Sequence, residues 1–350
     1  MINLLQKHTV DLYDFKNKEF ESQKIYARKL ITFSRFDLFA KITYIKYRSS
    51  NPDYARRIYS EHIKVFNPDL KEPGRDDKNG LEDFITSFDK LIDYFEGNEF
   101  DSEVSLIPVS EGGEILDGSH RIAALAYFDK EVKIVKFKGV QAVAKFDYNY
   151  FIKRGLSIKI ADTITYEGFN FVDNLFVACL WPKMGDIQKR SSARECFKKH
   201  FKILYQKDLK MSLDNLSMFI YEIYNHQDWV GTKENNYAGA RDKAFNCYAT
   251  NRTVQFIVFK AASLEEVLKV KDDIRKQYQL DKHALHITDN DEETKEIFDL
   301  ILTDKVNGYT SGTSRFVDRF IEFKAVVKNV YLISLKVKIA RILKLIGVYK

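Results

Sequence analysis

The chain has 350 residues, of which 45% are hydrophobic and 30% charged, a composition typical of a folded globular protein and not of a disordered one. Its length is sufficient for two domains with substantial cores. No apolar run reaches the roughly 20 residues of a membrane-spanning helix, and the first residues lack the pattern of a signal peptide. The three cysteines lie far apart and indicate reduced thiols, so we expect a cytoplasmic protein.

The net charge of +6 is concentrated at one end of the chain. Residues 315–350 contain nine Lys or Arg and two Asp or Glu, which gives this segment a net charge of +7 and leaves −1 for the rest. Nucleic-acid-binding domains normally present a basic face. A nucleic acid is therefore not the expected partner.

The first part of the chain predicts a helical segment followed by a compact unit of helices and strands. Apolar spacing of three and four indicates helices up to about residue 65, and Asn51 before Pro52 marks a helix start. Residues 67–80 form the clearest loop, with two prolines and two glycines. The elements expected after this loop are a helix at 81–95, strands at 105–109 and 114–118, a helix at 119–128 and a strand at 131–138.

The second part predicts helices up to about residue 225 and then an alternation of strands and helices. The strands are expected at 253–261 and 283–289, and the helices at 263–278 and 291–302. The fold class is thus α/β, in the mixed α+β sense. The predicted domains are a helical lead-in (1–66), a first α/β unit (67–150), a second helical and α/β domain (151–314) and a basic C-terminal helix (315–350).

The least ordinary stretch is EILDGSHRIAAL, residues 114–125, which passes from a predicted strand into a predicted helix. The start of a helix binds anions, phosphates above all, and Gly118 and Ser119 stand at this start. Arg121 adds donors suited to phosphate oxygens. Asp117 can hold Mg²⁺ or orient a nucleophile, and His120 can donate to a phosphoryl oxygen. The alternative is that Asp117 and Ser119 only cap the helix while His120 and Arg121 pair locally.

ILDGSHRIAAL resembles the D-G-x-H-R-x-x-A signature of the ParB/sulfiredoxin-like fold, and the resemblance covers roughly residues 70–140. Sulfiredoxins carry a cysteine where this chain has Ser119, so sulfinic-acid reduction is not expected. ParB proteins add a helix-turn-helix region, which residues 140–310 do not show. The branch closest in chemistry contains free-serine kinases, in which a glutamate from an upstream loop acts as base.

This resemblance implies a phosphotransferase that uses ATP or ADP with Mg²⁺ and an alcohol group as acceptor, on a small molecule or a sugar intermediate. By position, Glu72 corresponds to the base and Lys78 to a phosphate ligand, with Asp76 and Asp77 as further carboxylates. The alternative function is a ParB-like protein that binds DNA or a partner under the control of a nucleotide.

Two stretches of the second domain contain further candidates. In residues 228–243, Trp229 suits a sugar ring and Lys243 a phosphate, although core packing explains them as well. In residues 281–294, His286 and Asp289 stand at the end of a predicted strand, where α/β sheets place ligand groups, while Asp289 also suits the cap of the next helix. Together with the motif, these stretches resemble bacterial proteins of surface-polysaccharide assembly.

Residues 323–350 contain seven basic and no acidic residues, and apolar residues recur among them at spacings of three and four. Such a helix can lie on an anionic membrane surface, which would place the protein at the inner face of the membrane. The alternatives are a terminal helix that packs on the body of the protein and an arm that binds nucleic acid.

Overall fold

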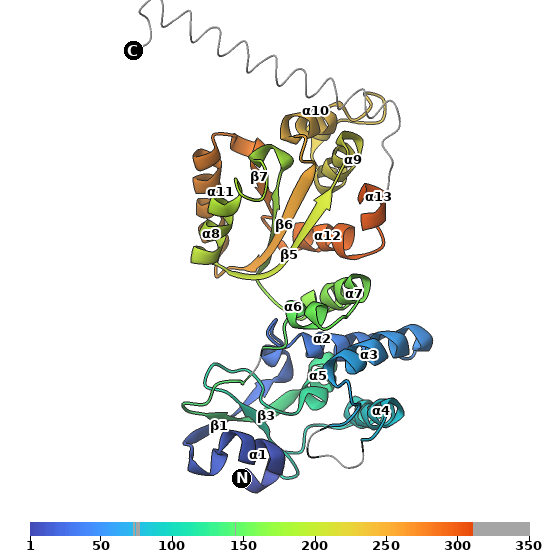
Figure 1. Cartoon of the computed structure of the whole chain (residues 1–350), viewed down its shortest axis with the longest axis vertical. Helices are drawn as coiled ribbons and strands as arrows, with labels where there is room; N and C mark the ends of the chain where they lie inside the picture. Colours follow the sequence, from blue (N-terminus) through green and yellow to red (C-terminus); the bar gives the residue numbers. More distant parts are fainter. Residues whose placement is uncertain (73, 75–77, 144, 311–350) are drawn as a thin grey trace, which may run out of the picture. The chain divides into compact units, whose positions relative to one another are not determined.

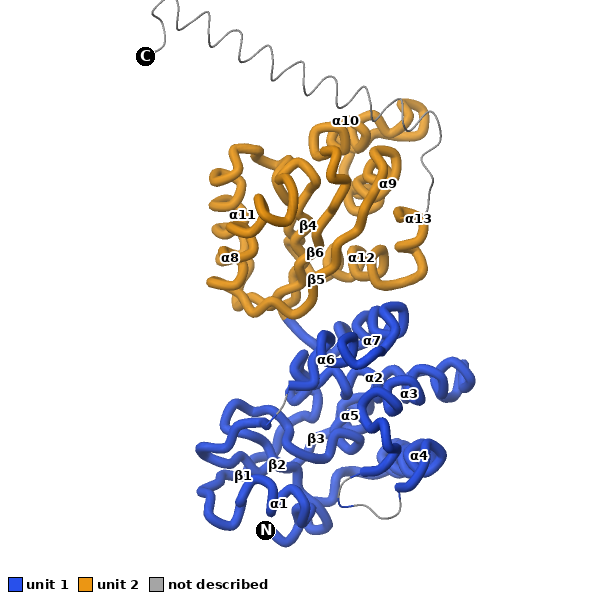
Figure 2. The backbone as a smooth tube through the Cα atoms, in the orientation of Figure 1, with its two compact units in different colours: residues 1–173 blue, residues 174–350 orange. Residues whose placement is uncertain are grey.

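The computed structural model describes residues 1–72, 74, 78–143 and 145–310. Its chain contacts divide it into two compact units, residues 1–173 and residues 174 onward (Figure 2). The sequence placed this boundary at 150/151. The difference arises because α6 and α7 pack on the helices of the first unit, α3 and α2. The predicted C-terminal helix, and with it the membrane contact of residues 323–350, lies outside the described residues.

The first unit combines seven α-helices and a small sheet, counted within its described residues (Figure 1). Its elements are α1 (Lys7–Tyr13), β1 (Phe20–Tyr26), α2 (Phe36–Tyr47), α3 (Pro52–Phe66), α4 (Leu81–Gly97), β2 (Ile107–Val109), α5 (Ser119–Tyr127), β3 (Glu131–Phe137), α6 (Tyr148–Lys153) and α7 (Ile158–Phe169). Asn51 caps α3 as predicted, accepting a hydrogen bond from the N–H of Tyr54.

The sheet of the first unit has the strand order β1-β3-β2. Strand β3 pairs in parallel with β2, from which the chain reaches it through α5, and antiparallel with β1. On one side of β3, Val135 and Phe137 pack with Phe15 in an apolar cluster. Helix α2 packs against α3, α5 and α7 and is almost entirely buried.

Two predictions for this unit were wrong. Residues 1–65 are not all helical, because Phe20–Tyr26 forms the edge strand β1. The expected strand 114–118 is reduced to a single bridge between Val109 and Ile115. The helix starting at Ser119 and strand β3 are confirmed.

The described part of the second unit is a four-stranded antiparallel sheet with helices on both faces, and the predicted mixture of helices and strands is confirmed. Its elements are β4 (Leu175–Leu180), α8 (Ser191–His200), β5 (Lys202–Lys210), α9 (Leu213–Tyr224), α10 (Ala238–Cys247), β6 (Thr253–Lys260), α11 (Leu264–Tyr278), β7 (Leu285–Ile287), α12 (Asp291–Leu302) and α13 (Val306–Thr310). Strands β4 and β5 correct the expectation that helices dominate up to residue 225.

The strand order of the second sheet is β5-β6-β4-β7. Helices α8 and α11 lie over one face, and α9 and α12 over the other (Figure 1). On the first face Phe197 and Phe201 pack on Phe259, with ring centroids 5.2 and 4.5 Å apart. On the opposite face Phe219 packs on Phe256 at 5.5 Å.

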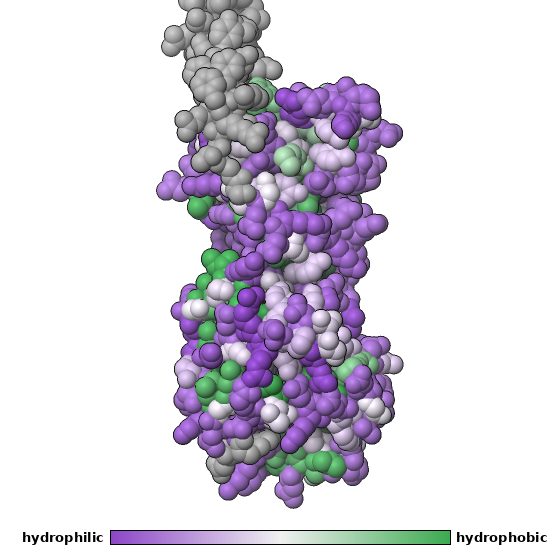
Figure 3. All heavy atoms as spheres, turned by 90° about the vertical axis from the view of Figure 1, so that its right-hand side faces the viewer, coloured by the Kyte–Doolittle hydropathy of each residue, from purple (hydrophilic) through white to green (hydrophobic). Residues whose placement is uncertain are grey.

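The surface drawn in Figure 3 is mostly polar, and its apolar side chains form small separate patches. Scattered patches of this kind are normal on protein surfaces. Within the described part of the chain, every helix is too short or too polar to cross a membrane.

Candidate functional site

The Asp-Gly-Ser-His-Arg motif lies at the start of helix α5. Gly118 adopts a left-handed backbone with a φ of 84°. A Cβ atom at this position would lie 2.6 Å from Ile107 Cδ1 and 2.8 Å from Arg121 Nη2. The backbone angle therefore favours glycine, and a larger residue would also displace the ends of the Ile107 and Arg121 side chains. The turn also brings Asp117 back to the helix, where its Oδ2 lies 3.5 Å from Arg121 Nη2.

The first turn of α5 has no side-chain cap. Gly118 occupies the N-cap position, and Ser119 is the first helical residue. Asp117 Oδ1 accepts a 2.6 Å hydrogen bond from the N–H of Gly118. The N–H groups of a helix start carry a partial positive charge and bind anions. Asp117 and Ser119 thus make no side-chain cap, but Arg121 pairs with Asp117, which is part of the local pairing that the alternative expects. The N–H groups of this turn could hold an anion such as a phosphate.

The second carboxylate oxygen of Asp117 is buried without a hydrogen-bond donor. Oδ2 has no hydrogen-bond partner among the described residues, although it lies within ion-pair distance of Arg121. Arg121 also donates through Nη1 to Ser105 Oγ. A buried carboxylate oxygen without a donor costs free energy. A cation beside Asp117, or a hydroxyl that donates to it, would satisfy this oxygen.

His120 lies between the motif and the helical layer. Its Nε2 is 2.8 Å from Tyr59 Oη, and its ring contacts the edge of Phe88 at a centroid distance of 4.8 Å. Burial, and after it the charges of Lys41 and Lys78, hold the pKa of His120 well below its ordinary value. The imidazole is therefore neutral at pH 7. It can donate or accept a hydrogen bond but adds no positive charge for a phosphate.

Glu72 and Lys78 reach this site from the loop before α4. Lys78 Nζ donates to Glu72 Oε2 and lies 5.1 Å from the centroid of the Phe84 ring. Lys78 is buried, whereas the Glu72 side chain keeps about a quarter of its surface exposed. The further carboxylates Asp76 and Asp77 lie outside the described residues.

A pocket of about 430 Å³, here called the α4 pocket, opens beside the motif. One part of its wall is polar, with Lys78 and Arg121 beside Asp117 and the first turn of α5. Another part comes from α4 and the loop after it and is apolar, lined by Leu91, Tyr94, Phe95, Phe100 and Val104. A polar wall beside an apolar one matches the phosphates and the base of a nucleotide.

A second pocket of about 390 Å³, here called the α2 pocket, shares part of this wall. The residues common to both pockets are Gln6, Glu72, Asp117, Gly118, Ser119 and His120. The structure thus brings together the predicted residues of the first unit that it describes, and it places most of them where two pockets meet.

Sequence reasoning missed a buried ionic cluster of Arg35, Asp37 and Lys41, two of which, Arg35 and Lys41, line the α2 pocket. Arg35 Nε and Nη2 lie 2.8 and 2.9 Å from the carboxylate of Asp37, and Lys41 Nζ lies 3.0 Å from it. Burial alone would raise the pKa of Asp37, but the charges of Arg35 and Lys41 outweigh it and hold this pKa well below its usual range. The available signal was three charged residues inside an otherwise mostly apolar run, FSRFDLFAKITYI.

His62 lies close to this cluster on α3. Neither ring nitrogen has a hydrogen-bond partner in the described part of the chain. The ring packs on Phe151 and Phe66 at centroid distances of 4.9 and 5.7 Å. Burial, with a smaller effect from Lys41, lowers the pKa of His62 to about 3.

We expect this histidine to make the first unit sensitive to acid. The unfolded chain takes up the proton near the ordinary pKa of 6.5, whereas the folded unit does so only near 3. As the pH falls from 6.5 towards 3, the free energy of unfolding of the first unit should therefore decrease by about 1.4 kcal/mol per pH unit. His62→Phe should remove this part of the pH dependence, as urea unfolding at pH 7 and pH 5 by circular dichroism can show.

Tryptophan fluorescence provides the internal control, because both tryptophans, Trp181 and Trp229, lie in the second unit. The fluorescence transition should be the same with and without His62→Phe. If the dichroism transition depends on pH equally in the wild type and in His62→Phe, His62 does not cause the acid sensitivity.

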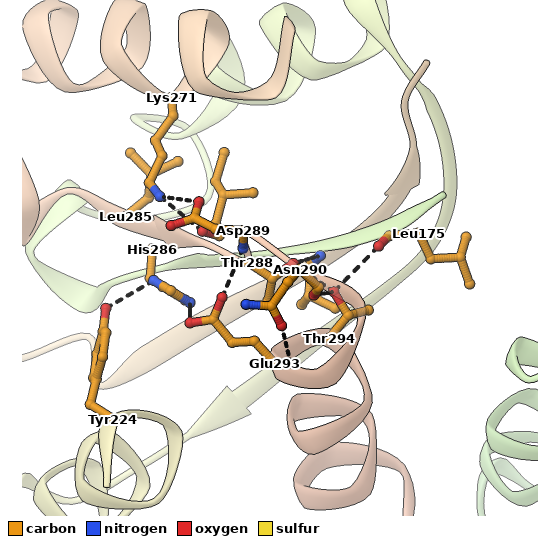
Figure 4. Close-up of polar contacts among 12 residues, drawn as sticks. Leu175, Tyr224, Lys271, Leu285, His286, Thr288, Asp289, Asn290, Glu293 and Thr294 are labelled. Carbon is orange, nitrogen blue, oxygen red and sulfur yellow. Dashed lines mark hydrogen bonds and ion pairs between the residues drawn. The ribbon is translucent and has the colours of Figure 1, made fainter. Parts of the chain in front are cut away.

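In the second unit, His286 belongs to a polar network that connects β7 to three helices (Figure 4). Its Nδ1 lies 2.9 Å from Tyr224 Oη on α9, and its Nε2 lies 3.1 Å from Glu293 Oε1 on α12. Glu293 Oε2 accepts a 2.8 Å bond from the N–H of Asp289, whose Oδ1 accepts one of 2.9 Å from Lys271 Nζ on α11. These contacts hold His286 and Asp289 in place, although Nε2 of His286 has only this ion-pair distance and no hydrogen bond among the described residues. A ligand at His286 and Asp289 stays a prediction.

Asp289 does not cap α12 as one reading of the sequence expected. The N-cap is Asn290, whose Oδ1 accepts a 2.8 Å hydrogen bond from the N–H of Glu293.

Burial lowers the pKa of His286, and the neighbouring carboxylate of Glu293 opposes this shift. The histidine is thus held neutral inside the network.

Trp229 and Lys243 lie side by side in this unit. Lys243 Nζ is 6.0 Å from the centroid of the Trp229 ring and 5.4 Å from that of Tyr224, and it donates to the carbonyl of Lys282. These cation–π contacts explain the buried lysine. Trp229 is 44% exposed, so a sugar ring stacked on it stays a prediction.

Comparison with known proteins does not assign this site to a family. The chain matches no protein-family model, no curated protein and no solved structure.

Proposed function

We propose that the first unit is a phosphotransferase that uses ATP or ADP with Mg²⁺ to phosphorylate a hydroxyl of a small molecule or sugar intermediate. The observation that carries this proposal is the position of the motif. An uncapped helix start and the carboxylates of Asp117 and Glu72 stand where two pockets meet, and Arg121 lines the α4 pocket beside them. Two reactants need such adjoining pockets to exchange a phosphoryl group directly.

The α4 pocket suits the nucleotide. Its apolar wall would hold the base, and the first turn of α5 with Arg121 and Lys78 would hold the phosphates. Lys78 now pairs with Glu72, and a phosphate would compete for it. Asp117 would hold Mg²⁺, and the ion would supply positive charge to the phosphates during the transfer.

The transfer would occur along the wall that both pockets share. The acceptor oxygen forms a bond to the terminal phosphorus while the bond from that phosphorus to the leaving nucleotide breaks. The hydroxyl proton goes to Glu72, and His120 donates a hydrogen bond to a phosphoryl oxygen. Positioning and charge neutralisation supply most of the rate enhancement in such reactions.

The decisive experiment is to incubate the protein with ATP or ADP, Mg²⁺ and a metabolite extract. Mass spectrometry should show one extract compound that gains a phosphoryl group while the nucleotide loses one. Nucleotide binding without any such product would favour the alternative, a ParB-like binding protein controlled by a nucleotide. Absence of nucleotide binding would contradict both.

Arg121→Ala should weaken nucleotide binding about ten- to a hundredfold. The substitution removes a charge-assisted contact to phosphate that is worth about 1.5–3 kcal/mol. Calorimetric titration with ATP or ADP measures this change. The matched control is Arg57→Ala, which removes an exposed arginine of α3 and should leave the affinity unchanged. An unchanged affinity in folded Arg121→Ala would rule out the phosphate site.

A further inference from the structure

The α2 pocket differs from the α4 pocket in having two buried cations in its wall. Lys41 and Arg35 line it and are only 1% and 7% exposed. Asp37, the acid that lies between them, is fully buried and does not line the pocket. The pocket therefore meets the positive side of the cluster.

The cluster also carries an excess of positive charge. Arg35 and Lys41 share the single carboxylate of Asp37. The Arg35 guanidinium also donates a 2.6 Å bond from Nη1 to the carbonyl of Ile115 and lies 5.6 Å from the centroid of the Phe146 ring. Burial lowers the pKa of Lys41, and Asp37 opposes this shift. A second anion beside Lys41 would favour its charged form further.

The rest of the wall sets the size and the orientation of a ligand. Aromatic rings of Phe66, Phe146 and Tyr150 line the pocket, and its volume of about 390 Å³ suits a small sugar or sugar acid. Glu72 and Asp117 also line it, in the part of the wall shared with the α4 pocket. A ligand held by the two cations could therefore direct a hydroxyl to the proposed base.

We infer that the α2 pocket selects an acceptor that carries an anionic group, a carboxylate or a phosphate, in addition to the hydroxyl that is phosphorylated. The anionic group would bind Lys41 and Arg35, and the hydroxyl would face Glu72 and Asp117. This inference rests on the proposed function and restricts its substrate class.

Three probes that differ in charge test it: glycerol, glycerate and glycerol 3-phosphate. Each is titrated calorimetrically into the full chain with saturating ADP and Mg²⁺, so that the α4 pocket is occupied. One of the two anions should bind at least tenfold more tightly than glycerol, and which of them does so distinguishes a carboxylate from a phosphate. Lys41→Met should reduce this binding at least tenfold while the affinity for ADP stays unchanged.

Lys41→Arg, which keeps the charge, should retain part of the binding. Lys29→Met, which removes an exposed lysine of the same unit, should behave as wild type. Equal binding of all three probes to the wild-type protein would overturn the inference, even if Lys41→Met does not fold. Anion binding that survives in Lys41→Met would do the same. The proposed function fails separately, if the wild-type protein does not bind ADP.

Discussion

Asp37→Ala is expected to lower the free energy of unfolding of the first unit by about 3–5 kcal/mol. The substitution leaves Arg35 and Lys41 buried side by side without their carboxylate, and an uncompensated buried charge is among the most destabilising changes known. Urea unfolding followed by circular dichroism measures the loss. Tryptophan fluorescence should show an unchanged transition of the second unit.

The matched control removes the whole cluster. The triple variant Arg35→Met, Asp37→Leu, Lys41→Met leaves no buried charge behind, so it should recover a large part of the stability that Asp37→Ala loses. The carbonyl of Ile115 would still lose its donor, and recovery should therefore be incomplete. A loss below about 1 kcal/mol in Asp37→Ala would show that water reaches the cluster.

Asp117→Asn is expected to lower turnover about 10²–10⁴-fold in the proposed phosphotransfer, while nucleotide binding remains measurable. Asparagine keeps the shape of the side chain but not the charge that would hold Mg²⁺ and orient the acceptor hydroxyl. Rate and nucleotide affinity are measured in parallel, with the phosphorylated product quantified by mass spectrometry.

Asp129→Asn is the control for this variant. Asp129 is exposed just beyond the other end of α5 and has a φ of 52°, which asparagine tolerates well. Its turnover should equal that of the wild type. Equal turnover in Asp117→Asn would instead mean that the carboxylate does not take part in the reaction.

The sequence predicted the start of α5 correctly because everything that defines it is local. Gly118, which suits a left-handed turn, precedes a run of good helix formers. A strand with alternating apolar residues follows the helix. The candidates Glu72 and Lys78 were placed only by their position in a loop. The fold places both residues in the same pocket as the motif, and no local sequence pattern indicates this proximity.

The strands that were missed have patterns that depend on their neighbours. β1, FESQKIY, is an edge strand with mostly exposed residues, so it lacks the alternation that identifies a half-buried strand. β4, LFVACL, is buried almost throughout, and a short apolar run cannot be distinguished from a helical segment by its period.

The three charged residues of the ionic cluster stand out in the sequence, but their burial could not be predicted from it. Arg35, Asp37 and Lys41 are residue types that normally face water, and their spacing within a helical run is compatible with an ordinary solvent-exposed face. Only the packing of α3, α5 and α7 around α2 buries them.

Strand β1 has a consequence for the synthesis of the protein. In the described sheet its one neighbour is β3, and the pairing from Phe20–Phe137 to Tyr26–Glu131 joins residues more than a hundred positions apart. At ribosomal rates of about 5–20 residues per second, β1 must wait on the order of 5–20 s for its partner. Its charged side chains, Glu21 and Lys24, disfavour pairing with other nascent chains during this time. The polar residues that make β1 difficult to recognise in the sequence thus also disfavour aggregation of the chain during synthesis.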